Sequence, residues 1–469
     1  ERGELEYLIA VDILNEGIDI PSLNQIIMLR PTQSAIIFVQ QMGRGLRKYR
    51  GKKFLTVIDF IGNYQNNYLI PIALFGNTSY KKDALRKLVS TGSLGIHGVS
   101  TVDFDRVAKE RIYKSINDTS FKTLKLLKAE YNRVKAKIGK IPCMRDFITH
   151  GVISPLLFIE YTKNFYSFKE KVEKPFKIEL SEEHLRSLNF LSHIIAPGIR
   201  PYEALIIEQL IENDTPITYM ELKEKVQQRY NFNLSQATVN SAVRIVTNEF
   251  YPEAMKKSYG QISYCEKTKD NLFISDRFKN LLQNATYKAE VEDILFVGKH
   301  EYKTAILPKR LKEDLILHHK YSREDVCRLL LWSRDEHATI YGYKVHRETM
   351  TCPIFVTYHK KTEEIDPSID YEDHFISTEE FAWETRTRVR LNSKEPRAIR
   401  GEEGPLRKLL FIQKNNDEGN TFYYMGEVDF LSNTQRSKQN GKGEKLPVVA
   451  VKFALKHPVP PDLYEYIEG

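Results

Sequence analysis

The stretch YLIAVDILNEGIDIPSLNQIIMLRPTQSAIIFVQQMGRGLR, residues 7–47, decides the fold of the first part of the chain. It contains a polar turn, NEGIDIP at 15–21, directly after an apolar run, and a second polar and basic cluster, QQMGRGLR at 40–47. Apolar runs bounded by turns are typical of strands buried in a parallel sheet. We expect such strands at 6–11, 25–30 and 54–60.

The QQMGRGLR cluster lies on a helix that we expect over 34–47. Gln40, Arg44 and Arg47 are spaced i, i+4 and i+7, so a helix projects all three side chains from one face. Two permanent cations suit a polyphosphate, and an arginine finger near a γ-phosphate accelerates its transfer by roughly 10³- to 10⁵-fold. We predict that Arg47 is the finger and Arg44 a second phosphate contact.

The turn at 15–21 fits the same site. Gly17 allows the backbone to turn tightly after the strand, and Asp19 places a carboxylate at the end of the turn. A sugar hydroxyl or a coupled arginine is the expected partner of that carboxylate.

Together, NEGIDIP and QQMGRGLR resemble motifs V and VI of the superfamily 2 helicases, in the second RecA-like lobe, and are close to the pattern of restriction-type and repair-type DNA translocases. The resemblance implies that the first motif binds nucleotide through Glu16, Gly17 and Asp19, and nucleic acid through Asp12. It implies γ-phosphate and finger roles for Gln40, Arg44 and Arg47. The family often carries Thr or Ser where Val11 stands, so one hydroxyl contact is absent.

An ordinary strand-end turn and a solvated helix face are the alternative interpretation of these two segments. A single short motif would favour that alternative, because short motifs often match by chance. Two motifs in the right order at a fitting distance favour the helicase.

The other half of an ATP site is missing from the sequence. It contains no G-x-x-x-x-G-K-[ST] phosphate loop and no D-E-x-[DH] box, which would cradle the phosphates and hold Mg²⁺. The chain opens with Glu1 just before an expected strand. We therefore expect the C-terminal part of a longer protein, with ATP and Mg²⁺ bound mainly by an upstream helicase lobe, and no ATP hydrolysis by this part alone.

Composition limits the remaining possibilities. With 469 residues, 41% of them hydrophobic, the chain is long enough for several domains. The four cysteines lack C-x-x-C spacing, which argues against zinc or a disulfide framework and suits the cytoplasm. The formal charge of +8 and local Lys and Arg clusters favour nucleic acid over a membrane as partner, although a solvated surface would explain the charge equally well.

The middle of the chain shows a winged-helix pattern. Helices are expected at 203–212, 218–230 and 235–250, followed by a hairpin within 258–275. In winged helices the third helix usually enters the major groove with its N-terminal residues. The candidates for nucleic-acid contacts are Ser235, Gln236, Thr238, Asn240, Ser241 and Arg244. Many winged helices bind protein instead, and Ser235 is also an ordinary helix cap.

The final third is rich in short strands with Gly and Asn turns, which predicts a β-rich barrel or sandwich. Its runs ATIYGYKV, FVTYHK, FAWETRTR, LFIQK, FYYMGEV and HPVPPDL resemble the uncharacterised C-terminal domain that follows the helicase core in bacterial proteins with an N-terminal phospholipase-D-like nuclease. Trp383 and Arg386 could stack on and bind an unpaired or flipped base, with Trp383 in the core as the alternative. A metal-dependent nuclease using Glu348 or Asp373 is a further alternative.

We therefore predict a multidomain α/β plus α+β protein. Its expected parts are a partial second RecA-like lobe, a helical basic connector, a winged-helix-like domain, a helical linker and a β-rich domain, at 1–80, 81–178, 179–275, 276–320 and 321–469. The expected function is that of the C-terminal part of an ATP-dependent DNA helicase or translocase in restriction or phage defence. The alternative is a reader of modified or single-stranded DNA. The expected partners are nucleic acid, the upstream lobe and the phospholipase-D-like nuclease.

Overall fold

The computed structural model describes residues 7–9, 20–29, 38–39, 42–43, 45–60, 67–77, 80, 82–92, 100–119, 123–150, 153–176, 180–213, 215–310, 315–359, 373–439 and 444–468. These residues form two compact units. The first unit consists of residues 1–127 and 151–154, and the second of residues 128–150 and 155–469.

The first unit contains a parallel strand pair and a helical hairpin. Strands β1 (Gln25–Met28) and β2 (Thr56–Asp59) run parallel, which confirms the two expected strands at these places. Residues 7–9 are not in a strand, and the rest of the first expected strand lies outside the described residues. Three helices follow: α2 (Leu69–Phe75), α3 (Lys82–Thr91) and α4 (Arg106–Asp118). Buried aliphatic side chains of α3 and α4 form the core of this pair.

The second unit begins with four helices around an aromatic core. They are α5 (Leu124–Ile138), whose first residues belong to the first unit, α6 (Met144–His150), α7 (Leu156–Thr162) and α8 (Phe165–Val172). Tyr131, Phe147 and Phe158 are at most 1% exposed, and their rings pack against Phe165 and Phe168 at centroid distances between 4.6 and 6.3 Å. The apolar stripe of α5 is therefore core, as its spacing predicts.

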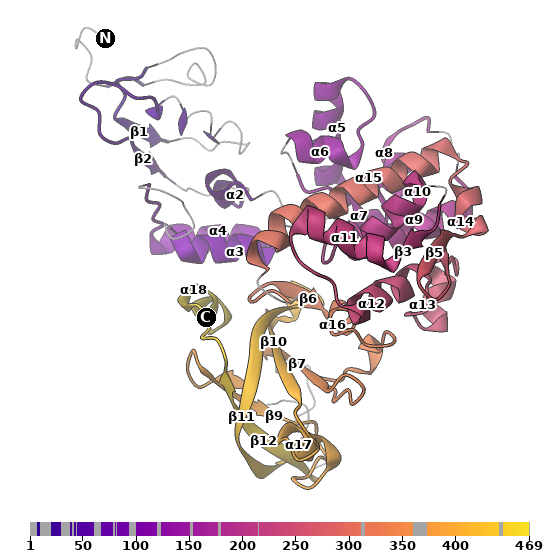
Figure 1. Cartoon of the computed structure of the whole chain (residues 1–469). Coiled ribbons are helices and arrows are strands. Elements are labelled where there is room, and N and C mark those ends of the chain that lie inside the picture. The colour runs from indigo at the N-terminus through magenta and orange to yellow at the C-terminus, as the bar shows by residue number, and fades with distance from the viewer. Residues whose placement is uncertain are drawn as a thin grey trace. The chain divides into compact units, whose positions relative to one another are not determined.

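The next elements occur in the order of a winged helix. They are α9 (Glu182–Ile194), α10 (Tyr202–Glu212), β3 (Ile217–Thr218), α11 (Tyr219–Tyr230), α12 (Gln236–Val246), α13 (Glu253–Ser258), β4 (Cys265–Lys267) and β5 (Asn271–Ile274). The three strands form a sheet in the order β3-β5-β4. The three expected helices correspond to α10, α11 and α12, and the expected hairpin is β4 with β5 (Figure 1).

The segment expected as a helical linker is helical, but it is part of the core. It contains α14 (Asp276–Leu281), α15 (Ala285–Glu301), a π-helical turn (Tyr302–Ile306) and a 3₁₀ turn (Leu307–Lys309). Side chains along the whole of α15 are buried, and Gly298 allows it to approach the backbone of Ile195 closely. A linker helix would expose most of its surface.

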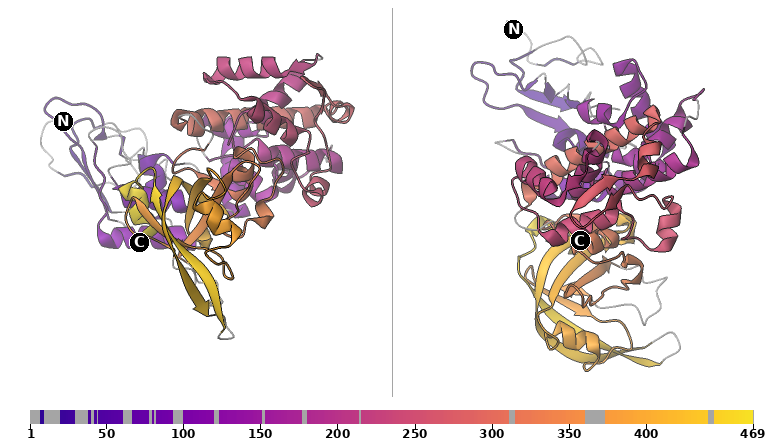
Figure 2. Two further views of the ribbon diagram at one scale, coloured as in Figure 1. Left: turned by 60° about the horizontal axis from the view of Figure 1, so that its bottom comes forward. Right: turned by 45° about the vertical axis from the view of Figure 1, so that its right-hand side comes forward.

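The rest of the second unit is built on one mixed sheet. Its elements are β6 (Lys320–Ser322), α16 (Arg323–Leu329), the 3₁₀ turn His337–Thr339, β7 (Thr351–His359), β8 (His374–Phe375), β9 (Glu380–Glu384), α17 (Lys394–Ile399), β10 (Arg407–Asn415), the 3₁₀ turn Asn416–Glu418, β11 (Thr421–Gln439), β12 (Lys445–Leu455) and α18 (Pro461–Glu468). The strand order is β7-β10-β11-β12-β9-β8, and β6 pairs with β11. The β11–β12 pair forms a long twisted ribbon (Figure 2).

The prediction of a barrel or sandwich is wrong for the described residues. The described residues of the final third form a single sheet with β7 and β8 at its two ends, and β7 pairs with β10 in parallel. The run ATIYGYKV contributes only isolated bridges of Tyr341 and Tyr343 instead of a strand. Short-range alternation cannot reveal this arrangement, because strand order depends on pairing between segments far apart in the chain.

Candidate nucleic-acid interface

The predicted nucleotide motifs lie almost entirely outside the described residues. This applies to Asp12, Glu16, Gly17, Asp19, Gln40 and Arg44. Arg47 is described, and its side chain is exposed.

Arg47 does not lie on the helix expected at 34–47. Described residues of that segment are helical as far as Gly45 and not beyond it. A Cβ on Gly45 would lie 2.7 Å from the Leu55 side chain, so the chain packs closely where the helix ends. The Lys52 ammonium donates to the carbonyls of Gly45 and, at 3.3 Å, of Arg47, which satisfies acceptors at a helix C-terminus.

Helix α12 is fixed by its cap and its apolar face. The Ser235 hydroxyl accepts a hydrogen bond from the Thr238 backbone N–H at 3.1 Å, a standard N-cap. Val239, Ala242 and Val243 are at most 2% exposed and hold one side of the helix in the core. The opposite side therefore faces away from the core.

Three predicted contacts form a row on this outer side. Gln236, Asn240 and Arg244 follow one another at four-residue intervals, and Gln236 donates to Asn240 at 3.2 Å. Gln236 and Asn240 are exposed, and Arg244 is half-buried. Ser241 is the exception: it is 1% exposed and accepts from the Arg200 guanidinium at 3.2 Å, so the prediction of a nucleic-acid contact for Ser241 is wrong.

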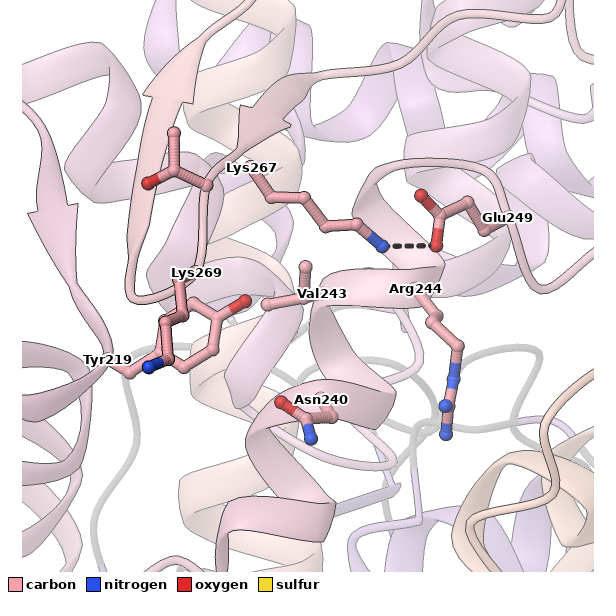
Figure 3. A pocket seen from close by; sticks show the side chains of 8 residues that line it. Tyr219, Asn240, Val243, Arg244, Glu249, Lys267 and Lys269 are labelled. Carbon is pink, nitrogen blue, oxygen red and sulfur yellow. Dashed lines mark hydrogen bonds and ion pairs between the residues drawn. The ribbon is translucent and has the colours of Figure 1, made fainter.

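Between α12 and the β4–β5 hairpin lies a pocket of about 560 Å³ (Figure 3). Its lining residues come from α11, α12, the segment just after α12 and the hairpin: Tyr219, Asn240, Val243, Arg244, Glu249, Lys267, Thr268 and Lys269. The Lys267 ammonium pairs with Glu249 at 2.5 Å, as Figure 3 shows. Lys269 is exposed in the hairpin turn, and no described residue pairs with it.

The pocket carries a positive charge. Arg244, Lys267 and Lys269 supply three cations against one carboxylate from Glu249, a net charge of +2. The Arg244 Nε is buried and has no hydrogen-bond partner among the described residues. A buried donor without a partner is costly, so an anion or acceptor bound here would relieve that cost. Burial also raises the pKa of Tyr219, which therefore stays a neutral O–H donor near neutral pH.

Trp383 and Arg386 do not form the predicted stacking platform. Trp383 is 3% exposed in the core of the sheet and packs edge-on against Tyr343 at 4.8 Å between ring centroids. The alternative that Trp383 is a core residue is what the structure shows. The Arg386 guanidinium lies 4.6 Å from the centre of the Tyr343 ring and pairs with Glu395 at 2.5 Å.

The two carboxylates of the nuclease alternative lie in ordinary contacts. Glu348 accepts from the Ser333 hydroxyl at 2.8 Å, and Asp373 accepts from the Glu384 backbone N–H at 2.9 Å. In the described part of the chain, no group of three or more His, Cys, Asp or Glu side chains could hold a metal ion. Its helices are also too short or too polar to cross a membrane.

Six of the eight lining residues of the pocket were not predicted as nucleic-acid contacts. Tyr219, Lys267 and Lys269 were not among the predicted contacts, because KTKD between two short strands is typical of any polar turn. The available signal was the spacing of two lysines in a hairpin that directly follows the third helix. In a winged helix that turn lies beside this helix.

Comparison with solved structures gives only remote similarity. A complex described as the sulfur binding domain and SRA domain of ScoMcrA with phosphorothioated DNA matches with 11% identity and a TM-score of 0.20, over 59% of this chain and 96% of that one. The type IV phosphorothioation-dependent restriction endonuclease ScoMcrA matches with 10% identity and a TM-score of 0.21, over 73% and 71% of the two chains. Scores this low support no argument about fold or function.

Similarity to curated proteins is local and concerns helicases. The chain is 42% identical over 62 residues to a Saccharomyces cerevisiae protein named as an ATP-dependent helicase, IRC3. It is 39% identical over 56 residues to a Methanocaldococcus jannaschii protein named as an ATP-dependent RNA helicase, MJ1505. The matches cover 13% and 12% of this chain but only 9% and 7% of these relatives.

Three protein families match consecutive parts of the chain. Residues 127–304 and 315–467 match two families described as domains of unknown function, DUF8090 and DUF3427. Residues 1–49 match the helicase conserved C-terminal domain. The chain is therefore helicase-related through the N-terminal part that matches this domain.

Proposed function

We propose that this chain is the C-terminal part of an ATP-dependent nucleic-acid translocase and that the α12–hairpin pocket holds the nucleic acid. The observation that carries the second part is the Arg244 guanidinium. Its Nε is buried and has no partner among the described residues, and Arg244 lines the same pocket as two lysines and the exposed Asn240. A phosphate oxygen would satisfy this donor, and phosphate contacts supply most of the affinity of proteins for nucleic acid.

The motor part of the proposal rests on the helicase match at residues 1–49 and on the exposed Arg47 within that range. In helicase-type enzymes an arginine completes the ATP site that another lobe begins. Arg47 would act as that finger, with Arg44 and Gln40 as further phosphate contacts and Glu16, Gly17 and Asp19 on the nucleotide. Asp12 would contact nucleic acid. ATP and Mg²⁺ would be held mainly by the upstream lobe.

Fluorescence anisotropy with a labelled duplex and a labelled single strand, titrated at several salt concentrations, tests the pocket. We expect the double variant Arg244→Gln and Lys269→Gln to lower the magnitude of the salt slope by about 1.8 on duplex, two contacts at ~0.9 each. The matched control is Lys257→Gln with Lys288→Gln, which removes the same charge from exposed positions outside the pocket. An equal reduction of the salt slope in both double variants, or no reduction in the Arg244→Gln with Lys269→Gln variant, would reject the pocket as the nucleic-acid site.

ATP hydrolysis stimulated by nucleic acid tests the motor, in the protein that joins this chain to a phosphate-binding lobe. Arg47→Ala should lower the stimulated rate by at least ~10³-fold, and Arg47→Lys should restore little because lysine lacks the planar, bidentate guanidinium. Full activity of Arg47→Ala would refute the finger role. A role in restriction or phage defence, a phospholipase-D-like partner and a cytoplasmic location stay predictions from the sequence.

A further inference from the structure

The segment from Arg386 to Lys394, here called the basic loop, connects β9 to α17 in the C-terminal sheet domain. Its sequence is RTRVRLNSK. It carries four cations and no carboxylate in nine residues. Among the described residues, carboxylates pair with only one of these cations, Arg386, through its ion pair with Glu395.

The backbone of the basic loop is anchored just before its first residue and in its middle, and its far end forms an internal turn. Just before the loop, the Thr385 N–H donates to the carbonyl of Val449 on β12, and the Thr385 hydroxyl accepts from the Val449 N–H, each at 2.9 Å. At its far end, the Ser393 N–H donates to the Arg390 carbonyl at 2.8 Å, and the Ser393 hydroxyl accepts from the Arg390 N–H at 3.0 Å. Val389 and Leu391 pack against the sheet core.

Gln435 fastens the middle of the loop to the β11–β12 ribbon. Its side-chain oxygen accepts from the Leu391 backbone N–H at 3.0 Å, and its amide nitrogen donates to the Val448 carbonyl of β12 at 2.7 Å. One side chain thus bridges the loop and the ribbon strand. A loop held in this way loses little conformational entropy when it binds a ligand.

The cations of the loop point away from these anchors. Val389 and Leu391 face the core, while Arg388, Arg390 and Lys394 are exposed. No described residue forms an ion pair or hydrogen bond with the side chains of these three cations. By contrast, the exposed Arg397 on the adjacent α17 pairs with Glu402 at 2.9 Å.

Arg388 also has a strained backbone. Its φ is +70°, and it is the only arginine with a positive φ among the described residues. Glycine, asparagine or aspartate would adopt this conformation at lower cost. Strained residues that are kept in place by their surroundings are concentrated at binding sites.

We propose that the basic loop is a second nucleic-acid contact, which grips the phosphodiester backbone through Arg388 and Arg390, with Lys394 beside them. A polyanion fits because three unpaired cations stand on one fixed backbone, and guanidinium groups bind phosphate oxygens in pairs. Base recognition is not part of this contact, since the aromatic Trp383 nearby is buried. The loop is distinct from the α12–hairpin pocket, so either can exist without the other.

The test uses anisotropy titrations of the whole chain with random-sequence duplex and single-stranded DNA and RNA over a range of salt. The variant is Arg388→Asn with Arg390→Gln, because asparagine tolerates the positive φ and keeps the loop folded. We expect the magnitude of the salt slope to decrease by about 1.8 on duplex or about 1.4 on a single strand, because each lost phosphate contact contributes ~0.9 or ~0.7. The control is Arg397→Gln, which removes an arginine that already has a carboxylate partner.

The proposal would be overturned if the Arg388→Asn with Arg390→Gln variant had the salt slope of the wild type. It would also be overturned if Arg397→Gln changed the slope equally per charge removed. Gln435→Ala gives a second readout, since it loosens the loop without changing its charge. We expect weaker binding with an unchanged slope, and wild-type affinity would show that the anchoring is irrelevant. Measuring the pocket variant Arg244→Gln with Lys269→Gln in the same titrations separates failure of this contact from failure of the proposed pocket.

Discussion

The buried Arg200 should be far more important for stability than any exposed ion pair of this chain. Its side chain and that of Glu203 are 0% and 2% exposed, and Nε donates to the Glu203 carboxylate at 2.6 Å. The same guanidinium donates to the Ser241 hydroxyl of α12 and to the Arg328 carbonyl of α16, both at 3.2 Å. Arg200 thus connects the helix of the proposed pocket with the beginning of the sheet domain.

Arg200→Met removes every one of these donors and leaves Glu203 charged or protonated in a dry site. Removing one partner of a buried pair costs about 3–5 kcal/mol. The double variant Arg200→Met with Glu203→Met should recover most of this loss, because apolar side chains of similar volume replace a buried pair at little cost. The matched control is Arg186→Met, whose pair with Glu182 has side chains 45% and 78% exposed and should cost no more than about 0.5 kcal/mol.

Urea unfolding followed by tryptophan fluorescence measures the effect. Trp332 is 0% exposed and lies four residues after Arg328, so its emission reports the region that Arg200 holds. With a slope of ~3 kcal/mol per M, a loss of ~4 kcal/mol shifts the midpoint by ~1.3 M. The reasoning is refuted if Arg200→Met shifts the midpoint no more than Arg186→Met, or if the double variant loses the sum of both single losses.

Three further changes test the packing, the pH dependence and the strain. Gly298→Ala should lower the free energy of unfolding by about 1–3 kcal/mol, because the new Cβ would lie 2.2 Å from the Ile195 carbonyl oxygen, and an unchanged melting temperature would contradict this. Burial is the largest single effect on the pKa of His193 and lowers it, but the hydrogen bond with Glu324 and the negative charges of Glu324 and Asp325 together outweigh burial, so the net pKa is raised. This stabilisation should be complete below pH ~6.5 and be lost as the pH rises through the higher folded pKa, so the urea midpoint should fall with pH less steeply in His193→Gln. Arg388→Gly should raise the free energy of unfolding by up to ~1.6 kcal/mol, because relief of strain contributes ~1–2 kcal/mol and the freer unfolded chain costs ~0.4–1 kcal/mol. A loss of stability would refute the strain.

Local patterns were sufficient to predict the helices and many strands. The expected strand at 25–30 corresponds to β1 (Gln25–Met28), and the expected helix at 203–212 to α10 (Tyr202–Glu212). These elements have apolar residues at the period of their own secondary structure, so the signal lies within one segment. The partners of a strand lie elsewhere in the chain, and the parallel pairing of β7 with β10 therefore had no local signal.

The segment that follows β9 shows where alternation fails to mark the end of a strand. In EFAWETRTRVRL, the large apolar residues Phe381, Trp383, Val389 and Leu391 lie an even number of positions apart, as residues on one face of a strand do, but β9 ends at Glu384. Val389 and Leu391 keep the alternation because they pack on the core from a loop. Apolar contact on one side gives a period of two in any extended segment, whether or not it pairs with a strand.

The same alternation could have placed Trp383 correctly. Phe381 and Trp383 are two residues apart, so in a strand they share one face, and two large aromatics on a face indicate the core side. That face is indeed buried, at 0% and 3% exposure. The cations of the run follow on the opposite side once the strand has ended, at Arg388 and Arg390. In this segment the aromatic residues supply the scaffold and the charged residues after it remain available for a ligand, a division typical of loops carried on a rigid sheet.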